Sequence, residues 1–319
     1  MDLTDVHVHL AALPTRDNGC LLSRRMRDRP AVWAAARSQG IPLDDPERAN
    51  ALYLEKLMGE LRRSRRVKRA VILGMDGVYD ASGELDERAT HFMISNRAVF
   101  AACARAPDLF LPGVSINPRR RDALEELERC ADQGAVLVKI LANVQGFDPG
   151  EARYRPFYRA MAARRLALLA HVGFEFSLVS RGQSLGEAHR LTAALEEGVT
   201  VIAAHGGSSG LFFWEREWPA LRRFVASHLN FYCDVSALTL GNRAGQLLRI
   251  RRHPELWGRL LFGTDYPLPV GAWPALAAGS WAGYVRARGA DNRFDRMALV
   301  LDALGIELTT DFASLWPRP

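Results

Sequence analysis

The sequence predicts an α/β fold, a (β/α)8 TIM barrel with an insertion after the first strand. Eight short apolar runs recur along the 319 residues, and most stretches between them have the apolar spacing of helices. Continuously apolar strands that alternate with helices favour a parallel sheet covered on its outside, and eight of them favour a closed barrel. Because one such barrel needs about 250 residues, we expect residues 1–319 to form a single domain.

The predicted strands follow one another at regular intervals. From the second strand onward, successive strands start 25 to 41 residues apart, and most steps are close to 30. A step of about 30 residues suits one strand–helix unit. The eight strands are Leu3–Leu10, Arg69–Asp76, Phe110–Asn117, Ala135–Leu141, Ala167–Gly173, Val199–Gly207, Leu229–Leu238 and Leu260–Pro267.

Helices are indicated between these strands by periodicity and by start signals. In the segment Arg155–Arg165, Phe157 and Met161 repeat with the four-residue spacing of an apolar helix face. Asp122 followed by Glu125 is a capping pair that is typical of a helix start.

The first interval is longer than the others. Its helical part, Ala49–Arg63, can serve as the first barrel helix, which leaves residues 11–48 as an insertion rich in proline and arginine. A loop after a barrel strand lies at the catalytic end, so we expect this insertion to lie over the active site.

Composition excludes several classes of protein. The formal charge is 42 − 36 = +6, without a basic block interleaved with aromatics, so we expect a small-molecule substrate and no nucleic acid. No apolar run reaches the ~18 residues of a membrane span, and the first ten residues lack the apolar core of a signal peptide. The four cysteines form no C-x-x-C pair, which favours reduced thiols and a cytoplasmic protein. A homodimer remains open.

Four of the eight histidines fall where a barrel enzyme builds its active site, at or near the carboxyl ends of predicted strands. These are His7, His9, His171 and His205. The other four lie in helical segments or just before strands, at His91, His189, His228 and His253.

The pair His7 and His9 suits metal binding, since side chains at i and i+2 share one face of a strand, about 6.6 Å apart. Asp265 ends the last strand, which neighbours the first in a closed barrel, and His171 ends the fifth. Each residue alone has a plainer explanation, as a polar strand end, a turn cap or a core histidine. Their convergence from three strands on one end favours a metal site.

Several motifs occur in a characteristic order at the strand ends. They are Asp5-Val6-His7-Val8-His9, Val138-Lys139-Ile140, Ala170-His171-Val172-Gly173, Ala204-His205-Gly206-Gly207 and Gly263-Thr264-Asp265-Tyr266-Pro267. With these motifs the chain resembles the amidohydrolase superfamily, and within it the amidohydrolase-related branch that includes aminocarboxymuconate-semialdehyde decarboxylase. The tail, Thr310–Trp316, departs from the Asn-Ala-x-Arg-Leu-like ending of many relatives.

The resemblance implies a divalent metal, usually zinc, with His7, His9, His171 and Asp265 as ligands. Imidazole and carboxylate ligands suit zinc. Asp265 would also take the proton of the metal-bound water. His205 would be a catalytic residue that polarises the substrate carbonyl, or a ligand to a second metal.

Lys139 decides between one metal and two. In two-metal relatives a carboxylated lysine on the fourth strand bridges the ions, and Lys139 is one of only three lysines in the chain. The alternative is a structural lysine paired with a carboxylate such as Asp76 or Glu175. We expect one metal, or two with Lys139 and His205 as additional ligands if Lys139 is carboxylated.

Candidate substrate contacts come from the loops after the strands. They are Arg24, Arg25, Asn143, Phe174 and Trp214. Arginine pairs with carboxylates and aromatic side chains pack against rings, which suits a small aromatic or unsaturated acid or its lactone. Each of these residues can equally be a solvated or packing residue.

We therefore expect a metal-dependent hydrolase that activates a metal-bound water to cleave a C–N or C–O bond in a small carboxylate-bearing substrate. The alternative on the same ligands is a non-oxidative decarboxylase or a hydratase. A TatD-like nuclease is disfavoured because that family has glutamate where this chain has Lys139. A non-catalytic binding protein is disfavoured because all four expected ligands are present.

Overall fold

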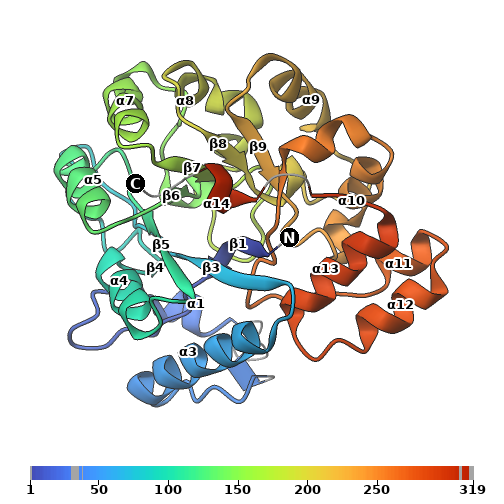
Figure 1. The fold of residues 1–319 in the computed structure, drawn as a ribbon. Helices are drawn as coiled ribbons and strands as arrows, with labels where there is room; N and C mark the ends of the chain where they lie inside the picture. Colours follow the sequence, from blue (N-terminus) through green and yellow to red (C-terminus); the bar gives the residue numbers. More distant parts are fainter. Residues whose placement is uncertain (1, 30–35, 38, 309–310, 316–319) are drawn as a thin grey trace.

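The structure is a computed structural model that describes residues 2–29, 36–37, 39–308 and 311–315. Eight parallel strands lie side by side in chain order and form the barrel in Figure 1, which confirms the predicted fold class. The strands are β1 (Leu3–His9), β3 (Val67–Leu73), β5 (Phe110–Ser115), β6 (Leu137–Ile140), β7 (Ala167–Ala170), β8 (Val201–Ala203), β9 (Phe231–Asp234) and β10 (Leu260–Leu261).

Hydrogen bonds between the last and the first strand complete the ring. Although β10 has only two residues, the chain after it continues along β1, where Val6 N donates to Phe262 O (3.0 Å). Further along, Asp265 N donates to His7 O and His9 N donates to Tyr266 O, both at 2.9 Å. These bonds fix Asp265 beside the two histidines of β1.

Helices surround the barrel, as Figure 1 shows. The covering helices are α3 (Pro46–Arg63), α4 (Asn96–Arg105), α5 (Ala123–Asp132), α7 (Arg155–Ala163), α8 (Thr192–Glu196), α9 (Trp218–Ser227), α10 (Ala244–Arg251) and α13 (Arg293–Leu304). Shorter helices are α1 (Arg24–Arg27), α6 (Ala142–Gln145), α11 (Pro274–Ala277), α12 (Trp281–Arg288) and α14 (Phe312–Leu315). Short 3-10 helices are η1 (Ala152–Tyr154), η2 (Gln183–Gly186), η3 (Ala188–Leu191), η4 (Ala204–Gly207), η5 (Gly241–Arg243) and η6 (Pro254–Arg259).

Two helix starts differ in detail from the sequence-based expectation. Helix α3 begins three residues earlier, at Pro46, because the Asp45 side chain accepts a bond from Arg48 N and proline suits the first turn. Asp122 does precede α5, but its carboxylate makes no capping bond. It instead accepts two bonds from the Arg120 guanidinium, at 2.9 and 2.8 Å.

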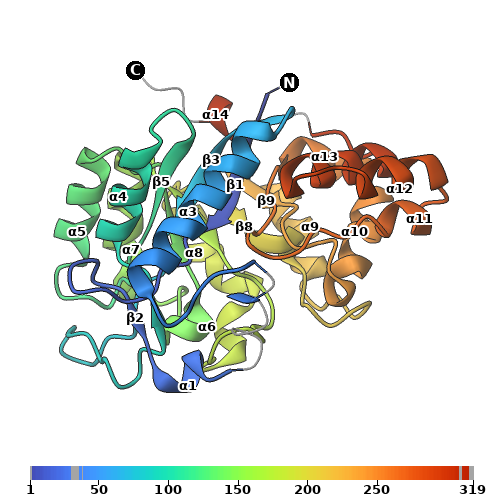
Figure 2. The same cartoon turned by 90° about the horizontal axis from the view of Figure 1, so that it is seen from below.

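Apolar side chains fill the barrel interior, so a ligand can bind only at the barrel mouth, which is the end formed by the carboxyl ends of the strands. One cluster lies inside the strands and a larger one lies between strands and helices. Figure 2 places α14 at the end of the barrel away from α1, β2 and α6. The inner cluster includes Val6, Val71, Leu73, Leu111, Leu137, Leu169, Ile202, Leu261 and, from α14, Phe312.

The insertion after β1 is anchored at two places. Its strand β2 (Leu21–Leu22) pairs antiparallel with β4 (Phe92–Met93). Beyond α1, the Arg29 guanidinium donates to the carbonyl oxygens of Ser177 (2.6 Å) and Phe176 (3.1 Å), in the loop after β7. Residues 30–35 and 38 of the insertion lie outside the described residues.

Two expectations about the whole chain can be compared with the structure. Within the described residues, no helix combines the length and the apolar character that crossing a membrane requires. The cysteines are all buried free thiols: Cys20, Cys103, Cys130 and Cys233.

A buried carboxylate ties α13 to the residues between α3 and β3. Asp295 accepts hydrogen bonds from the Ser64 hydroxyl (2.7 Å), from the backbone N–H groups of Arg65 and Arg66, and from the Asn292 amide. Burial alone would raise the pKa of Asp295, but these donors hold it below its ordinary value.

We expect Asp295→Asn to lower the free energy of unfolding by about 1–3 kcal/mol at pH 7, because buried donors lose a charged acceptor. Since the folded-state pKa is depressed, this stabilisation is present above the unfolded pKa near 4 and is lost as the pH falls through the folded-state value. Urea unfolding at pH 7 and pH 3 measures the difference. The control is Asp302→Asn, which removes an exposed ion pair with Arg66 and should change stability little. An equal effect of both variants, or no pH dependence, would contradict this assignment.

Candidate metal centre

Three predicted ligands come together at the barrel mouth. His7 Nε2 lies 3.2 Å from His9 Nε2 and 3.4 Å from Asp265 Oδ1, and His9 Nε2 lies 3.0 Å from the same oxygen. Four ligands placed tetrahedrally at 2.0–2.1 Å from zinc would be separated by about 3.3 Å. The donor atoms of these residues are therefore spaced as ligands of one small cation would be.

Protonation states also suit metal binding. Burial is the largest influence on the pKa of His7 and lowers it, which favours the neutral imidazole that a metal needs. Burial alone would raise the pKa of Asp265, but His7, His205 and His9 hold it well below its usual range. The site thus offers a neutral nitrogen donor at His7 and an ionised carboxylate at Asp265.

The fourth predicted ligand, His171, lies close by but is not part of this cluster. Among the described residues, only His7, His9 and Asp265 have donor atoms that all lie within 4.8 Å of one another around this point. His171 Nε2 is buried without a hydrogen-bond partner in the described structure, and Glu175 Oε2 is 3.7 Å away. A buried imidazole nitrogen with no partner is costly, and a metal would satisfy it.

His205 occupies a second position at the mouth. Its ring stacks on the His7 ring with centroids 5.0 Å apart, and its Nδ1 contacts the Ser236 hydroxyl at 2.9 Å. Burial and then the charge of Arg243 lower its pKa well below the ordinary value. Because Nδ1 is engaged, the other ring nitrogen is the one left for a ligand.

Asp234 is a site residue that the sequence analysis missed. It ends β9, and its Oδ2 lies 2.7 Å from His7 Nδ1, while its Oδ1 accepts from His205 N (2.8 Å) and the Ser236 hydroxyl (2.5 Å). A carboxylate on the outer nitrogen of a ligating histidine fixes the tautomer and the ring orientation. The available signal was the one acidic residue within the apolar strand predicted at Leu229–Leu238.

Asp234, His7 and His205 form a second group with metal-like spacing. The Ser236 hydroxyl lies among them, at 3.0 Å from His7 Nδ1 and 2.9 Å from His205 Nδ1. Since this hydroxyl already links the three side chains, the group orients histidines and leaves no open position for an ion.

Backbone conformation marks the same residues. His205 and Asp265 have φ angles of 59° and 64°, in the left-handed region that residues other than glycine rarely adopt. Strained backbone of this kind occurs at functional sites, where the surrounding structure enforces it. For Asp265 the enforcing contact is its N–H bond to His7 O.

Lys139 reaches the centre from β6. It is fully buried, its Nζ lies 3.3 Å from His7 Nε2, and burial lowers its pKa to about 8. Within the described part of the chain it forms no ion pair with Asp76 or Glu175, so the structural pairing considered for it is absent. Its amine points at the metal centre.

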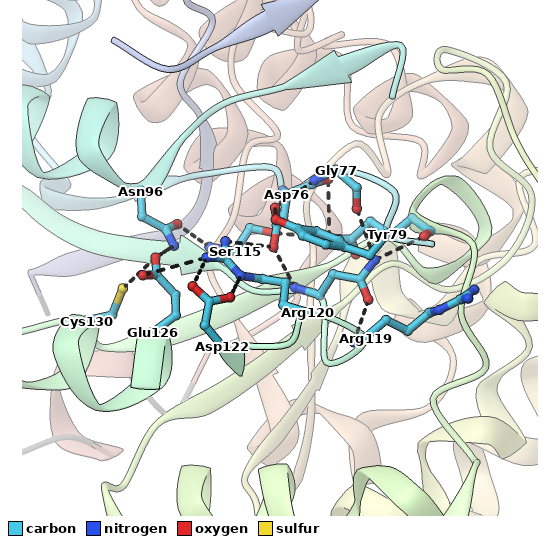
Figure 3. A network of polar contacts seen from close by, with 12 residues as sticks. Asp76, Gly77, Tyr79, Asn96, Ser115, Arg119, Arg120, Asp122, Glu126 and Cys130 are labelled. Atoms are coloured by element: carbon cyan, nitrogen blue, oxygen red, sulfur yellow. Dashed lines mark hydrogen bonds and ion pairs between the residues drawn. The ribbon is translucent and has the colours of Figure 1, made fainter. Parts of the chain in front are cut away.

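Asp76 is instead the centre of a separate network, which Figure 3 shows. Its carboxylate accepts from Asn117 N (2.7 Å) and the Tyr79 hydroxyl (2.9 Å), and the Arg120 guanidinium lies 3.6 Å away. The Ser115 hydroxyl extends the network by donating to the Lys139 carbonyl (2.8 Å). This network fixes the strand ends beside Lys139 rather than its amine.

Arg243 is the second residue that the sequence analysis missed. It lies in η5, it is only 6% exposed, and in the described structure no carboxylate lies within ion-pair distance of it. In the described structure its guanidinium makes one hydrogen bond, from Nη1 to Ser208 O (3.1 Å). Burial lowers its pKa against the pull of Asp265 and Glu175. A buried guanidinium with no carboxylate within ion-pair distance can pair with an anion.

The predicted substrate contacts are placed less favourably. Arg24 and Arg25 are exposed on α1, and Trp214 is 70% exposed. Asn143 is buried and its amide donates to Gly173 O (3.2 Å), so it supports the loop after β7. Phe174 is half-buried and stacks on the ring of Phe176.

The fold is a TIM barrel with a candidate metal centre, and sequence comparison gives the family. Residues 4–292 match the family model described as amidohydrolase, so the chain belongs to the amidohydrolase family. This confirms the predicted relationship. No curated protein sequence matches the chain at a significant level.

Solved structures share the fold at low sequence identity. An uncharacterized TIM-barrel protein from Bordetella bronchiseptica has a TM-score of 0.59 and 17% identity, over 96% of this chain and 100% of that chain. A proposed 2-pyrone-4,6-dicarboxylic acid hydrolase from Pseudomonas putida has a TM-score of 0.53 and 16% identity, over 96% of this chain and 98% of that chain. The 2,6-dihydroxybenzoate decarboxylase from Rhizobium has a TM-score of 0.50 and 16% identity, over 95% of this chain and 98% of that chain. Similarity at this level concerns the fold.

We expect Asp234→Asn to weaken zinc binding about 10- to 100-fold, because His7 loses the carboxylate that orients it. Competition with a fluorescent zinc chelator measures the affinity. The control is Glu215→Gln, which removes another buried carboxylate, one that bonds Ser208 and Ser209. Unchanged affinity in Asp234→Asn, or the same loss in both variants, would show that Asp234 does not act through His7.

Proposed function

We propose that the protein is a metal-dependent hydrolase that cleaves a C–O or C–N bond in a small carboxylate-bearing substrate. The observation that carries this proposal is the convergence of His7, His9 and Asp265 donor atoms within 3.0–3.4 Å at the barrel mouth. Membership of the amidohydrolase family supports a divalent metal there.

The proposed ligands are His7, His9, His171 and Asp265. The unsatisfied Nε2 of His171 supports its inclusion, since a buried imidazole nitrogen without a partner is costly and a metal would satisfy it. A bound divalent cation supplies Lewis acidity and makes hydroxide available near neutral pH. One metal is proposed, because in the described residues the donor atoms of His7, His9 and Asp265 form one open cluster, and Ser236 occupies the other donor group.

The two oxygens of Asp265 suit different roles. Oδ1 faces His7 and His9, whereas Oδ2 lies toward His205, 3.9 Å from its Nδ1. With a metal bound, Oδ1 would be the oxygen placed to hold it, and Oδ2 would be placed to accept the proton of the attacking water. His205, held by Ser236, uses its other ring nitrogen to polarise the carbonyl under attack.

Arg243 is the proposed anchor for the substrate carboxylate. Its charge contributes to lowering the pKa of both His171 and His205, which supports a position close to these two histidines. A guanidinium pairs with a carboxylate through two parallel bonds. The Phe174–Phe176 stack, in the loop after β7, offers an apolar wall for a flat ring.

Decarboxylation of a ring acid is the second candidate. The same ligands and the same Arg243 would serve it, and the fold neighbours include both a decarboxylase and a proposed hydrolase of ring carboxylates. Product analysis separates the two reactions, because only decarboxylation releases CO₂.

The experiment supplies the purified zinc-loaded chain with two compounds, 2-pyrone-4,6-dicarboxylate and 2,6-dihydroxybenzoate, and follows ring absorbance and CO₂. We expect loss of the pyrone absorbance without CO₂. Asp265→Asn should lower kcat at least about 100-fold, because it removes the proton acceptor and a charged ligand. CO₂ as a product, or activity that survives in Asp265→Asn, would contradict the proposal.

Arg243→Lys provides a contrasting variant in the same assay. It keeps the charge but loses the paired bonds, so KM should rise about 10- to 100-fold with a much smaller change in kcat. A fall in kcat alone would remove Arg243 from the substrate contact.

A further inference from the structure

Helix α12 presents its large apolar side chains to solvent. Trp281 is 68% exposed and Val285, one turn later, is 51% exposed. Leu276 from α11 adds a third apolar side chain, 41% exposed. Figures 1 and 2 place α11 and α12 on the outer flank of the molecule, beyond α13.

The opposite face of α12 carries small residues. Gly283 and Ala287 are buried, and a Cβ added at Gly283 would lie 2.4 Å from the Ala303 Cβ of α13. The two helices therefore pack closely through small side chains. This is the reverse of an ordinary surface helix, which buries its large apolar residues.

A groove runs beside the apolar ridge that Trp281, Val285 and Leu276 form. Its volume is about 420 Å³, and its walls are Ala272, Trp273, Tyr284, Arg288 and Arg296. Tyr284 and Arg288 form one row along α12, and Trp281 and Val285 form the adjacent row. The Trp281 and Tyr284 rings are 5.6 Å apart, so ridge and groove belong to one continuous surface.

We propose that a second copy of this chain covers the ridge and groove, with the two α12 helices antiparallel about a two-fold axis. A two-fold interface uses the same patch on both subunits, so each patch must carry a projection and its complement. Here Trp281 is the projection and the neighbouring groove is the complement. The indole of each copy fills the groove of the other.

Shape and a cation–π contact favour this occupant. Arg288 lines the groove, with its guanidinium 6.0 Å from the Tyr284 ring centroid. A guanidinium attracts the face of an indole. An anionic membrane would also attract arginines, but a flat bilayer leaves a concave groove unfilled.

Sedimentation velocity of the full chain between 1 and 100 μM tests the proposal. We expect a dimer, and we expect Trp281→Ala to weaken its association at least about 30-fold, as for a central interface tryptophan. Trp214→Ala is the matched control, since Trp214 is 70% exposed on another surface and its loss should leave the dimer intact. Because Trp281 is exposed, the thermal unfolding of its alanine variant should stay close to that of the parent chain.

A second variant and a second probe keep the outcomes separate. Arg288→Glu should also weaken the dimer, because it removes the guanidinium that faces the indole. A monomer across the whole range, or a dimer that both variants leave unchanged, would overturn the proposal. Binding of a monomer to phosphatidylglycerol vesicles that Trp281→Ala abolishes would overturn it in favour of a membrane surface.

Discussion

The hydrogen bonds that close the barrel are the constraint on which the site depends. Asp265 N donates to His7 O, and this bond places a carboxylate of the last strand beside two histidines of the first. The same contact holds Asp265 in a left-handed backbone conformation, which turns its side chain toward the mouth. Without closure, His7 and His9 would lie at one edge of an open sheet and Asp265 at the other.

Around this contact, several buried polar side chains hold one another through hydrogen bonds, and two other groups are bonded less completely. Asp234 and Ser236 hold the outer sides of His7 and His205, and the Asp76 network of Figure 3 fixes the strand ends next to Lys139. His171 Nε2 and the Arg243 guanidinium are left incompletely satisfied. A metal would satisfy the His171 nitrogen, and an anionic substrate would satisfy the Arg243 guanidinium.

Much of the fold could be predicted from the sequence, because eight apolar runs at intervals near 30 residues leave few other arrangements. His7, His9 and Asp265 could also be predicted, since strand position alone puts them at one end of one barrel. Asp234 and Arg243 could not be singled out, because their importance comes from contacts with residues far away in the chain. For the same reason, the sequence could not show whether Lys139 lies near His7 or pairs with Asp76.

The central claim is that His7, His9, His171 and Asp265 bind one divalent metal. Elemental analysis of protein purified without chelators or immobilised nickel tests it most directly. The account predicts about one zinc or manganese per chain, as expected for a single site of four ligands. A chain that holds no metal, even after reconstitution with zinc and with manganese, would contradict it.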